Sequence, residues 1–165
     1  MTYDELLAMY GNLKIKEIDL SGVDPEGEYE GIYSDGRIYI RSDIPTTTQK
    51  ACILAEEVGH HYTTVGDILD QTDIRNAKQE NIAMAWAYEE MIPLHALVEA
   101  YWAGITTRYE LAEFLGVTEQ FLQESLDYFK RKYDNYYILG NCLICFDPLA
   151  VAELKGSGTD EMQKM

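Results

Sequence analysis

Basic residues are scarce in this sequence of 165 residues. Lysine and arginine together number 13 against 29 aspartates and glutamates, which gives a formal net charge of −16 at pH 7. A surface this negative repels the phosphate backbone of DNA and RNA, so we expect no direct nucleic-acid partner. The charge also has a simpler explanation, because a high net charge keeps a protein in solution whatever its function.

Long apolar runs and a disulfide framework are missing as well. No stretch reaches the roughly 20 apolar residues that span a bilayer, so we expect no membrane partner. The N-terminus carries Asp4 and Glu5 where a secretory signal has its apolar core. Three cysteines are an odd number, and the C-x-x-C of Cys142 and Cys145 falls in a strand pattern that favours buried thiols over a metal pair. We therefore expect a cytoplasmic protein.

The sequence does contain strand and helix patterns in an order that predicts an α+β fold. We expect a small antiparallel or mixed sheet packed on a long helix, followed by a helical C-terminal portion and a terminal β-hairpin. The expected helices are 2–10, 46–62, 74–92, 94–102, 107–115 and 119–132, and the expected strands lie in 15–20, 31–41 and 136–146. We expect three regions: a core at 1–104, a helix-turn-helix-like pair plus the hairpin at 105–154, and a flexible tail at 155–165.

The most informative stretch is 54–62, which reads Leu-Ala-Glu-Glu-Val-Gly-His-His-Tyr. Glu56 and His60 are four residues apart, so a helix places them on one face, one turn apart. Glu57 lies beside that pair, displaced by about 100° around the helix axis. Two ligands one turn apart with a carboxylate next to them is the arrangement of a helical zinc-peptidase site, His-Glu-x-x-His, with Glu56 in place of the first histidine.

The helix that carries this motif is largely apolar. Ile53, Leu54 and Val58 predict that it is buried, and a buried carboxylate or imidazole is costly unless it is paired or bound to a cation. That cost is the physical reason to expect a metal ion. The alternative is that the acids point to solvent and His60 is an ordinary core histidine.

Glu80 is the candidate for a third ligand. It precedes Ala83 and Ala87 on the same face of the next long helix, and small residues allow two helices to pack closely. Close packing would bring Glu80 to Glu56 and His60. Taken alone, Glu80 fits equally well as one more surface acid on an acidic helix.

Two further segments have alternative interpretations. Residues 37–41 alternate as a strand whose edge could accept an extended peptide, or which could simply cover the motif helix. Residues 107–132 resemble a helix-turn-helix with Gly116 at the turn, but the second helix begins with Glu119 and also carries Glu124 and Asp127. This charge favours a packing motif over a DNA reader.

The residues 54–61, taken together with 80–93, resemble those of the ImmA/IrrE family of metallopeptidases. The resemblance covers most of the chain and implies a zincin-like fold around the motif helix. It places Glu56 and His60 on the first two zinc ligands, Glu80 on the third, and Glu57 on the catalytic acid–base. The family resemblance implies an intracellular, zinc-dependent endopeptidase that cuts a partner repressor, here a helix-turn-helix repressor of a prophage or integrative element. The alternative is an inactive module that binds the repressor without cutting it.

The replacement of a histidine by Glu56 has a chemical consequence. A His₂Glu site on a divalent ion carries a net charge of about +1, whereas Glu56, His60 and Glu80 bring it to about zero. Such a site acidifies water less, and its oxygen-rich ligands favour harder ions such as Mn²⁺ relative to Zn²⁺. We therefore expect a weaker hydrolase or one with another preferred ion. No residue can be assigned to oxyanion stabilisation, for which His61, Tyr62 and Tyr88 are the candidates.

Overall fold

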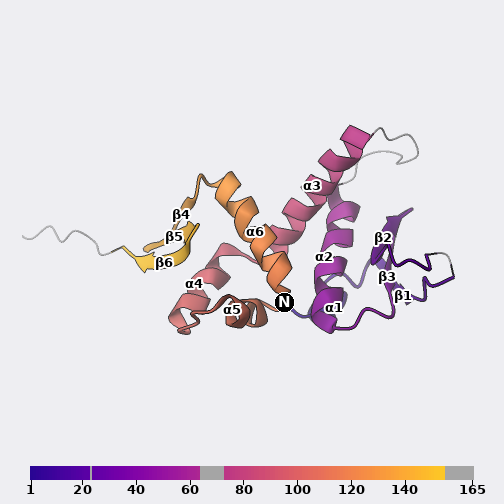
Figure 1. Ribbon diagram of the computed structural model, residues 1–165, viewed down its shortest axis with the longest axis horizontal. Helices are drawn as coiled ribbons and strands as arrows, with labels where there is room; N and C mark the ends of the chain where they lie inside the picture. Colours follow the sequence, from indigo (N-terminus) through magenta and orange to yellow (C-terminus); the bar gives the residue numbers. More distant parts are fainter. Residues whose placement is uncertain (23, 64–72, 155–165) are drawn as a thin grey trace, which may run out of the picture.

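The computed structural model describes residues 1–22, 24–63 and 73–154, and its elements confirm the α+β class (Figure 1). The predicted flexible tail, 155–165, lies outside these residues. The helices are α1 (Tyr3–Met9), α2 (Thr47–Thr63), α3 (Asp73–Met91), α4 (Leu94–Trp102), α5 (Arg108–Leu115) and α6 (Glu119–Lys132). The strands are β1 (Lys14–Ile18), β2 (Gly31–Ser34), β3 (Arg37–Arg41), β4 (Tyr136–Leu139), β5 (Cys142–Phe146) and β6 (Leu149–Glu153).

The N-terminal sheet has the strand order β1-β3-β2. β2 and β3 form the expected antiparallel hairpin, whose turn residues Asp35 and Gly36 both have positive φ, while β1 runs parallel to β3. Because β3 is the central strand, both of its edges are already paired. The interpretation of residues 37–41 as an open edge for a peptide is therefore wrong, and among the described residues β2 is the edge strand next to α2.

The motif helix α2 lies against this sheet on one side and against α3 on the other. The Thr46 hydroxyl caps its start by accepting the Gln49 N–H at 3.1 Å. Ala51, Leu54 and Val58 are fully buried, as the sequence predicted. Figure 1 shows α2, α3 and α6 between the two sheets, which lie at opposite ends of the molecule.

The C-terminal half packs α4 and α6 against a second sheet of order β4-β5-β6, and α5 packs on α4 and α6. Gly116 ends α5 in the left-handed conformation, with φ of 71°, and the Thr118 hydroxyl caps α6. The expected terminal hairpin has a third strand, β6, because the chain turns at Asp147–Pro148 and returns along β5. The sequence did not reveal β6, since its residues are mostly exposed and follow a proline.

Among the described residues, every helix is too short or too polar to cross a membrane. Cys142 is buried and Cys145 is half-buried, and both thiols are free. The division of the chain near residue 104 stays a prediction.

Candidate metal centre

The structure brings together three of the residues that the sequence singled out. Glu56 and His60 lie one turn apart on α2, and Glu80 reaches them from α3. One ligand atom from each lies within 4.8 Å of the other two, and His60 Nε2 is 3.2 Å from Glu80 Oε2. Tetrahedral ligands of zinc stand about 3.4 Å apart, so this set needs only a small adjustment to hold one ion.

Gly59 explains how α2 and α3 approach so closely. A Cβ atom at this position would lie 2.5 Å from the carbonyl oxygen of Ala83, a distance that no packed side chain tolerates. Ala83 and Ala87 are fully buried on the facing side of α3, as the small-residue pattern predicted. Glu80 lies one turn before Ala83, so this contact also fixes the distance from Glu80 to His60.

Glu57 is placed differently from the other acids, because its side chain is buried against strand β2. Only 7% of the residue is exposed. A Cβ atom at Gly31 would lie 2.5 Å from Glu57 Oε1 and 2.8 Å from its Cγ, so the strand can pass over this carboxylate only where it has no side chain. The backbone N–H of Tyr33 donates a hydrogen bond to Glu57 and holds it in place.

The electrostatics of the centre favour a cation. Burial, then the charges of Glu56 and Glu80, raise the pKa of Glu57 to about 8, although the Tyr33 hydrogen bond acts in the opposite direction. Burial followed by Glu80, Glu124 and Glu30 raises the pKa of Glu56 to about 7. A divalent ion would reverse both shifts, because it stabilises the charged carboxylates.

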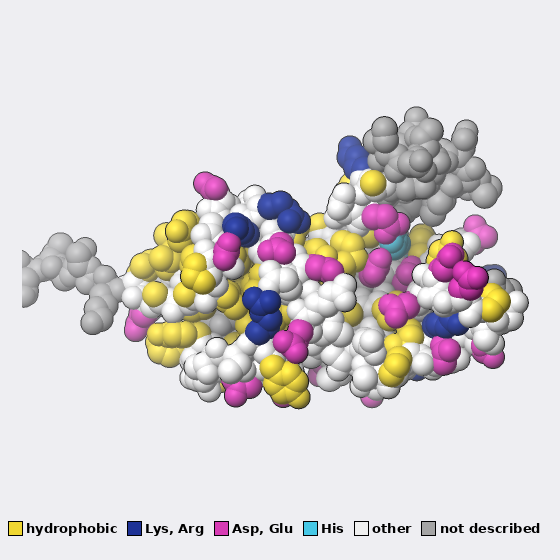
Figure 2. Space-filling model, in the orientation of Figure 1, with side chains coloured by type: hydrophobic (Ala, Val, Ile, Leu, Met, Phe, Trp, Pro, Cys, Tyr) yellow, Lys and Arg dark blue, Asp and Glu magenta, His cyan; other side chains and the backbone are white. Residues whose placement is uncertain are grey.

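A cavity of about 300 Å³ opens over these residues and has acidic walls. Its described lining contains no lysine or arginine and consists of Glu28, Tyr29, Glu30, Gly31, Ile53, Glu56, Glu57, His60 and Glu80. Figure 2 shows acidic side chains around a patch of histidine between α3 and the N-terminal sheet. Two carboxylates and an imidazole at ligand spacing form a donor set that fits a divalent ion.

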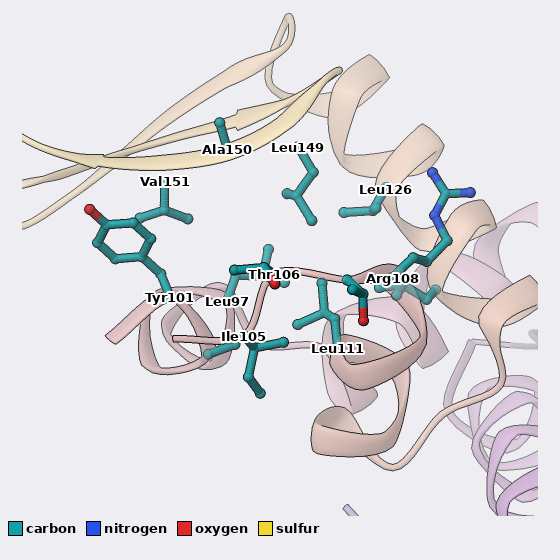
Figure 3. Close-up of a pocket in the computed structure, with 13 residues that line it drawn as sticks. Leu97, Tyr101, Ile105, Thr106, Arg108, Leu111, Leu126, Leu149, Ala150 and Val151 are labelled. Carbon is teal, nitrogen blue, oxygen red and sulfur yellow. The ribbon is translucent and has the colours of Figure 1, made fainter. Parts of the chain in front are cut away.

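A second cavity, of about 480 Å³, lies in the C-terminal half but carries no comparable chemistry. Leu97 and Ile105 line it from one side, and Leu149 and Val151 of β6 face them (Figure 3). Its described lining holds neither carboxylate nor imidazole. The candidate functional site is therefore the smaller, acidic cavity.

The three candidates for oxyanion stabilisation do not line the acidic cavity. The ring of Tyr62 packs against Tyr10 and Trp86. The ring of His61 packs edge-on against Tyr33 and Tyr62. The Tyr88 hydroxyl donates to Glu124 at 3.3 Å. No residue is therefore assigned to oxyanion stabilisation.

Residues 8–127 match the family model for the IrrE N-terminal-like domain, peptidase family M78. The chain belongs to this family. Searches of curated proteins and of solved structures found no match. Membership confirms the resemblance inferred from residues 54–61 and 80–93, and it establishes a metallopeptidase-type fold, for which a divalent ion is the implied cofactor.

Gly31 and Glu124 are two residues that sequence reasoning did not assign to the site. Gly31 stands at the start of a strand, and the sequence carries no signal that a carboxylate from another element packs on it. In the sequence, Glu124 is only one of the acids that argue against DNA binding by α6. In the structure it lies close enough to Glu56 to raise the pKa of that carboxyl. Both are placed by packing between elements far apart in the chain.

Proposed function

We propose that the protein is a metal-dependent intracellular endopeptidase that cleaves a partner protein. The observation that carries this proposal is the convergence of Glu56, His60 and Glu80 from two helices, with Glu57 buried beside them. Zn²⁺ is the ion that the family suggests, and the oxygen-rich ligand set supports Mn²⁺ as an alternative.

We assign metal binding and proton transfer to different residues of the centre. Glu56, His60 and Glu80 would hold the ion, which supplies Lewis acidity toward water and the scissile carbonyl. Glu57 would take a proton from the attacking water and pass it to the leaving amine. The contact with Gly31 and the hydrogen bond from Tyr33 keep this carboxylate in one position, so little is lost in orienting it.

The edge strand β2 is the element we propose to bind the substrate backbone. Gly31 of β2 lines the acidic cavity, and β2 is paired on one side only within the described sheet. An extended peptide could add to this edge by backbone hydrogen bonds and pass its carbonyl over the metal ligands. This arrangement favours a flexible segment of a protein as the substrate.

The partner we propose is a helix-turn-helix repressor of a prophage or integrative element, so that cleavage would relieve repression in the cytoplasm. Support comes from family membership together with charge, because a DNA-binding protein presents basic side chains and this chain carries a net charge of −16.

One observation favours a second candidate function. Glu56 stands where the family pattern has histidine, and the extra negative charge weakens the Lewis acidity of the ion. A protein with this ligand set could hold the repressor without cutting it. The two candidates differ in whether Glu57 is needed.

Co-expression of the protein with the repressor encoded beside its gene separates the two candidates. The endopeptidase proposal predicts a repressor fragment that disappears in Glu57→Gln and persists in Glu99→Gln, a control at an exposed position on α4. A stable complex with no fragment, together with derepression that survives Glu57→Gln, would establish the binding role instead. A fragment that forms equally in both variants would overturn the proposed site.

A further inference from the structure

A third cavity, of about 280 Å³, adjoins the candidate metal centre. It shares Glu30, Ile53 and Glu56 with the acidic cavity, so the two cavities lie side by side. The remaining residues of its lining come from α2, α3 and the first turns of α6, and they are Gln49, Cys52, Met84, Thr118, Gln120, Phe121 and Glu124. A peptide lying across the metal ligands would therefore have one neighbouring side chain next to this cavity.

The walls of the adjoining cavity combine apolar side chains with carboxylates and other polar groups. Ile53, Met84 and Phe121 supply the apolar surface. Glu124 is held at both of its oxygens, by the Tyr88 hydroxyl at 3.3 Å and by the Gln120 amide at 3.0 Å. Within the described residues, Glu124 forms no ion pair with lysine, arginine or histidine. In the described part of the chain it is therefore an oriented carboxylate that is not engaged in an ion pair.

Binding of a metal ion does not explain the carboxylates that line this cavity. Among the described residues, the carboxylates of Glu30, Glu56 and Glu124 do not form a group close enough to share one ion, whereas Glu56, His60 and Glu80 do. At about 280 Å³ the cavity is also slightly smaller than the usual small-molecule sites, which start at roughly 300 Å³. Its volume, its apolar side chains and its carboxylates suit a single side chain with an apolar stem and a positively charged end.

We propose that this cavity is the specificity pocket for a lysine or arginine side chain adjacent to the scissile bond, and that Glu124 recognises its cationic end. The aliphatic stem would lie against Ile53, Met84 and Phe121, and the charged end would reach Glu124 with Glu30 nearby. This inference rests on the proposed function and names its substrate class, a peptide with a basic residue beside the cleaved bond.

The test compares two peptides that differ only in having lysine or methionine at the position next to the cleaved bond. Methionine keeps the apolar stem and lacks the charge. For the metal-loaded wild type we expect the lysine peptide to be favoured in kcat/KM by roughly tenfold to a hundredfold, the range for a hydrogen bond to a charged group. Glu124→Gln should abolish this preference, and Glu124→Lys should reverse it toward a glutamate peptide. Glu119→Gln, on the same helix and exposed, is the matched control and should leave the preference unchanged.

A binding measurement keeps this inference separate from the hydrolase proposal. Fluorescence anisotropy of the same labelled peptides on the metal-loaded Glu57→Gln protein reports recognition without cleavage. A lysine preference that Glu124→Gln removes would support the pocket even if the wild type cuts neither peptide, in which case the hydrolase proposal fails alone. Equal binding of the two peptides, or a preference that survives Glu124→Gln in a protein with an unchanged melting temperature, would overturn the pocket.

Discussion

The replacement Gly59→Ala tests whether the close contact of α2 and α3 builds the metal centre. The added Cβ would lie 2.5 Å from the carbonyl oxygen of Ala83, 3.1 Å from its carbonyl carbon and 3.3 Å from its Cα. An ordinary contact is about 3.4 Å, so the two helices must separate by about 1 Å at this point. All three atoms belong to the backbone of α3, which cannot rotate out of the way as a side chain does.

Two effects of Gly59→Ala on stability oppose each other. Overpacking of this kind costs about 1–3 kcal/mol. Alanine regains about 1 kcal/mol over glycine inside a helix. The net loss should therefore be small, on the order of 1 kcal/mol, and thermal unfolding of the metal-free protein measures it.

The effect on metal binding should be much larger. Glu80 lies one turn before Ala83, so a displacement of α3 by about 1 Å moves it away from His60, while metal–ligand distances tolerate only about 0.2 Å. We expect the affinity for Zn²⁺ or Mn²⁺ to fall by roughly 10-fold to 100-fold. Titration calorimetry with each ion provides the measurement, and Gly22→Ala, where an added Cβ meets nothing within 4 Å, is the matched control. An unchanged affinity in Gly59→Ala would refute the reasoning.

Three further predictions concern the acids of the centre. Gly31→Ala should push Glu57 out of place and lower kcat by at least roughly tenfold, with KM and metal affinity retained. Steady-state kinetics measure kcat and KM, and calorimetry measures the metal affinity. An unchanged kcat would show that β2 does not position the carboxylate. In the metal-free protein the raised pKa values, about 7 for Glu56 and about 8 for Glu57, mean that the folded state binds more protons than the unfolded chain between about pH 4.5 and 8. Stability should therefore fall as the pH rises through this window, by up to about 1.4 kcal/mol per pH unit for each group, and a flat profile of melting temperature with chelator present would contradict it. Glu56→His should shift the ion preference toward Zn²⁺ and raise peptidase activity. Elemental analysis measures the ion preference, and a cleavage assay with each ion measures the activity. Equal activity of the variant and the wild type would show that the first ligand does not limit catalysis.

The sequence predicted those parts of the site that depend on helical periodicity. The four-residue spacing of Glu56 and His60 put them on one face, and the small residues Ala83 and Ala87 indicated which face of α3 meets α2. The Asp35-Gly36 turn likewise predicted the β2–β3 hairpin, because its residues adopt positive φ readily.

The remaining features depend on contacts between distant segments, which a local pattern does not encode. The sequence did not indicate that β3 is central, because the parallel pairing of β1 with β3 joins strands that are separated in the chain by a loop and by β2. It did not reveal that Gly31 covers Glu57, or that α6 brings Glu124 beside the cleft. Each of these positions is set by how elements pack against each other, after the elements themselves have formed.

The most direct test of the account is a count of bound ions in the purified protein after saturation with Zn²⁺ or Mn²⁺ and dialysis. We expect one ion per chain in the wild type, and loss of that ion in Glu56→Ala, His60→Ala and Glu80→Ala. Glu28→Ala, an exposed acid in the same cavity, should retain it. A wild-type protein that stays free of metal, or an ion count that none of the three ligand replacements lowers, would contradict the central claim that α2 and α3 together form a metal centre.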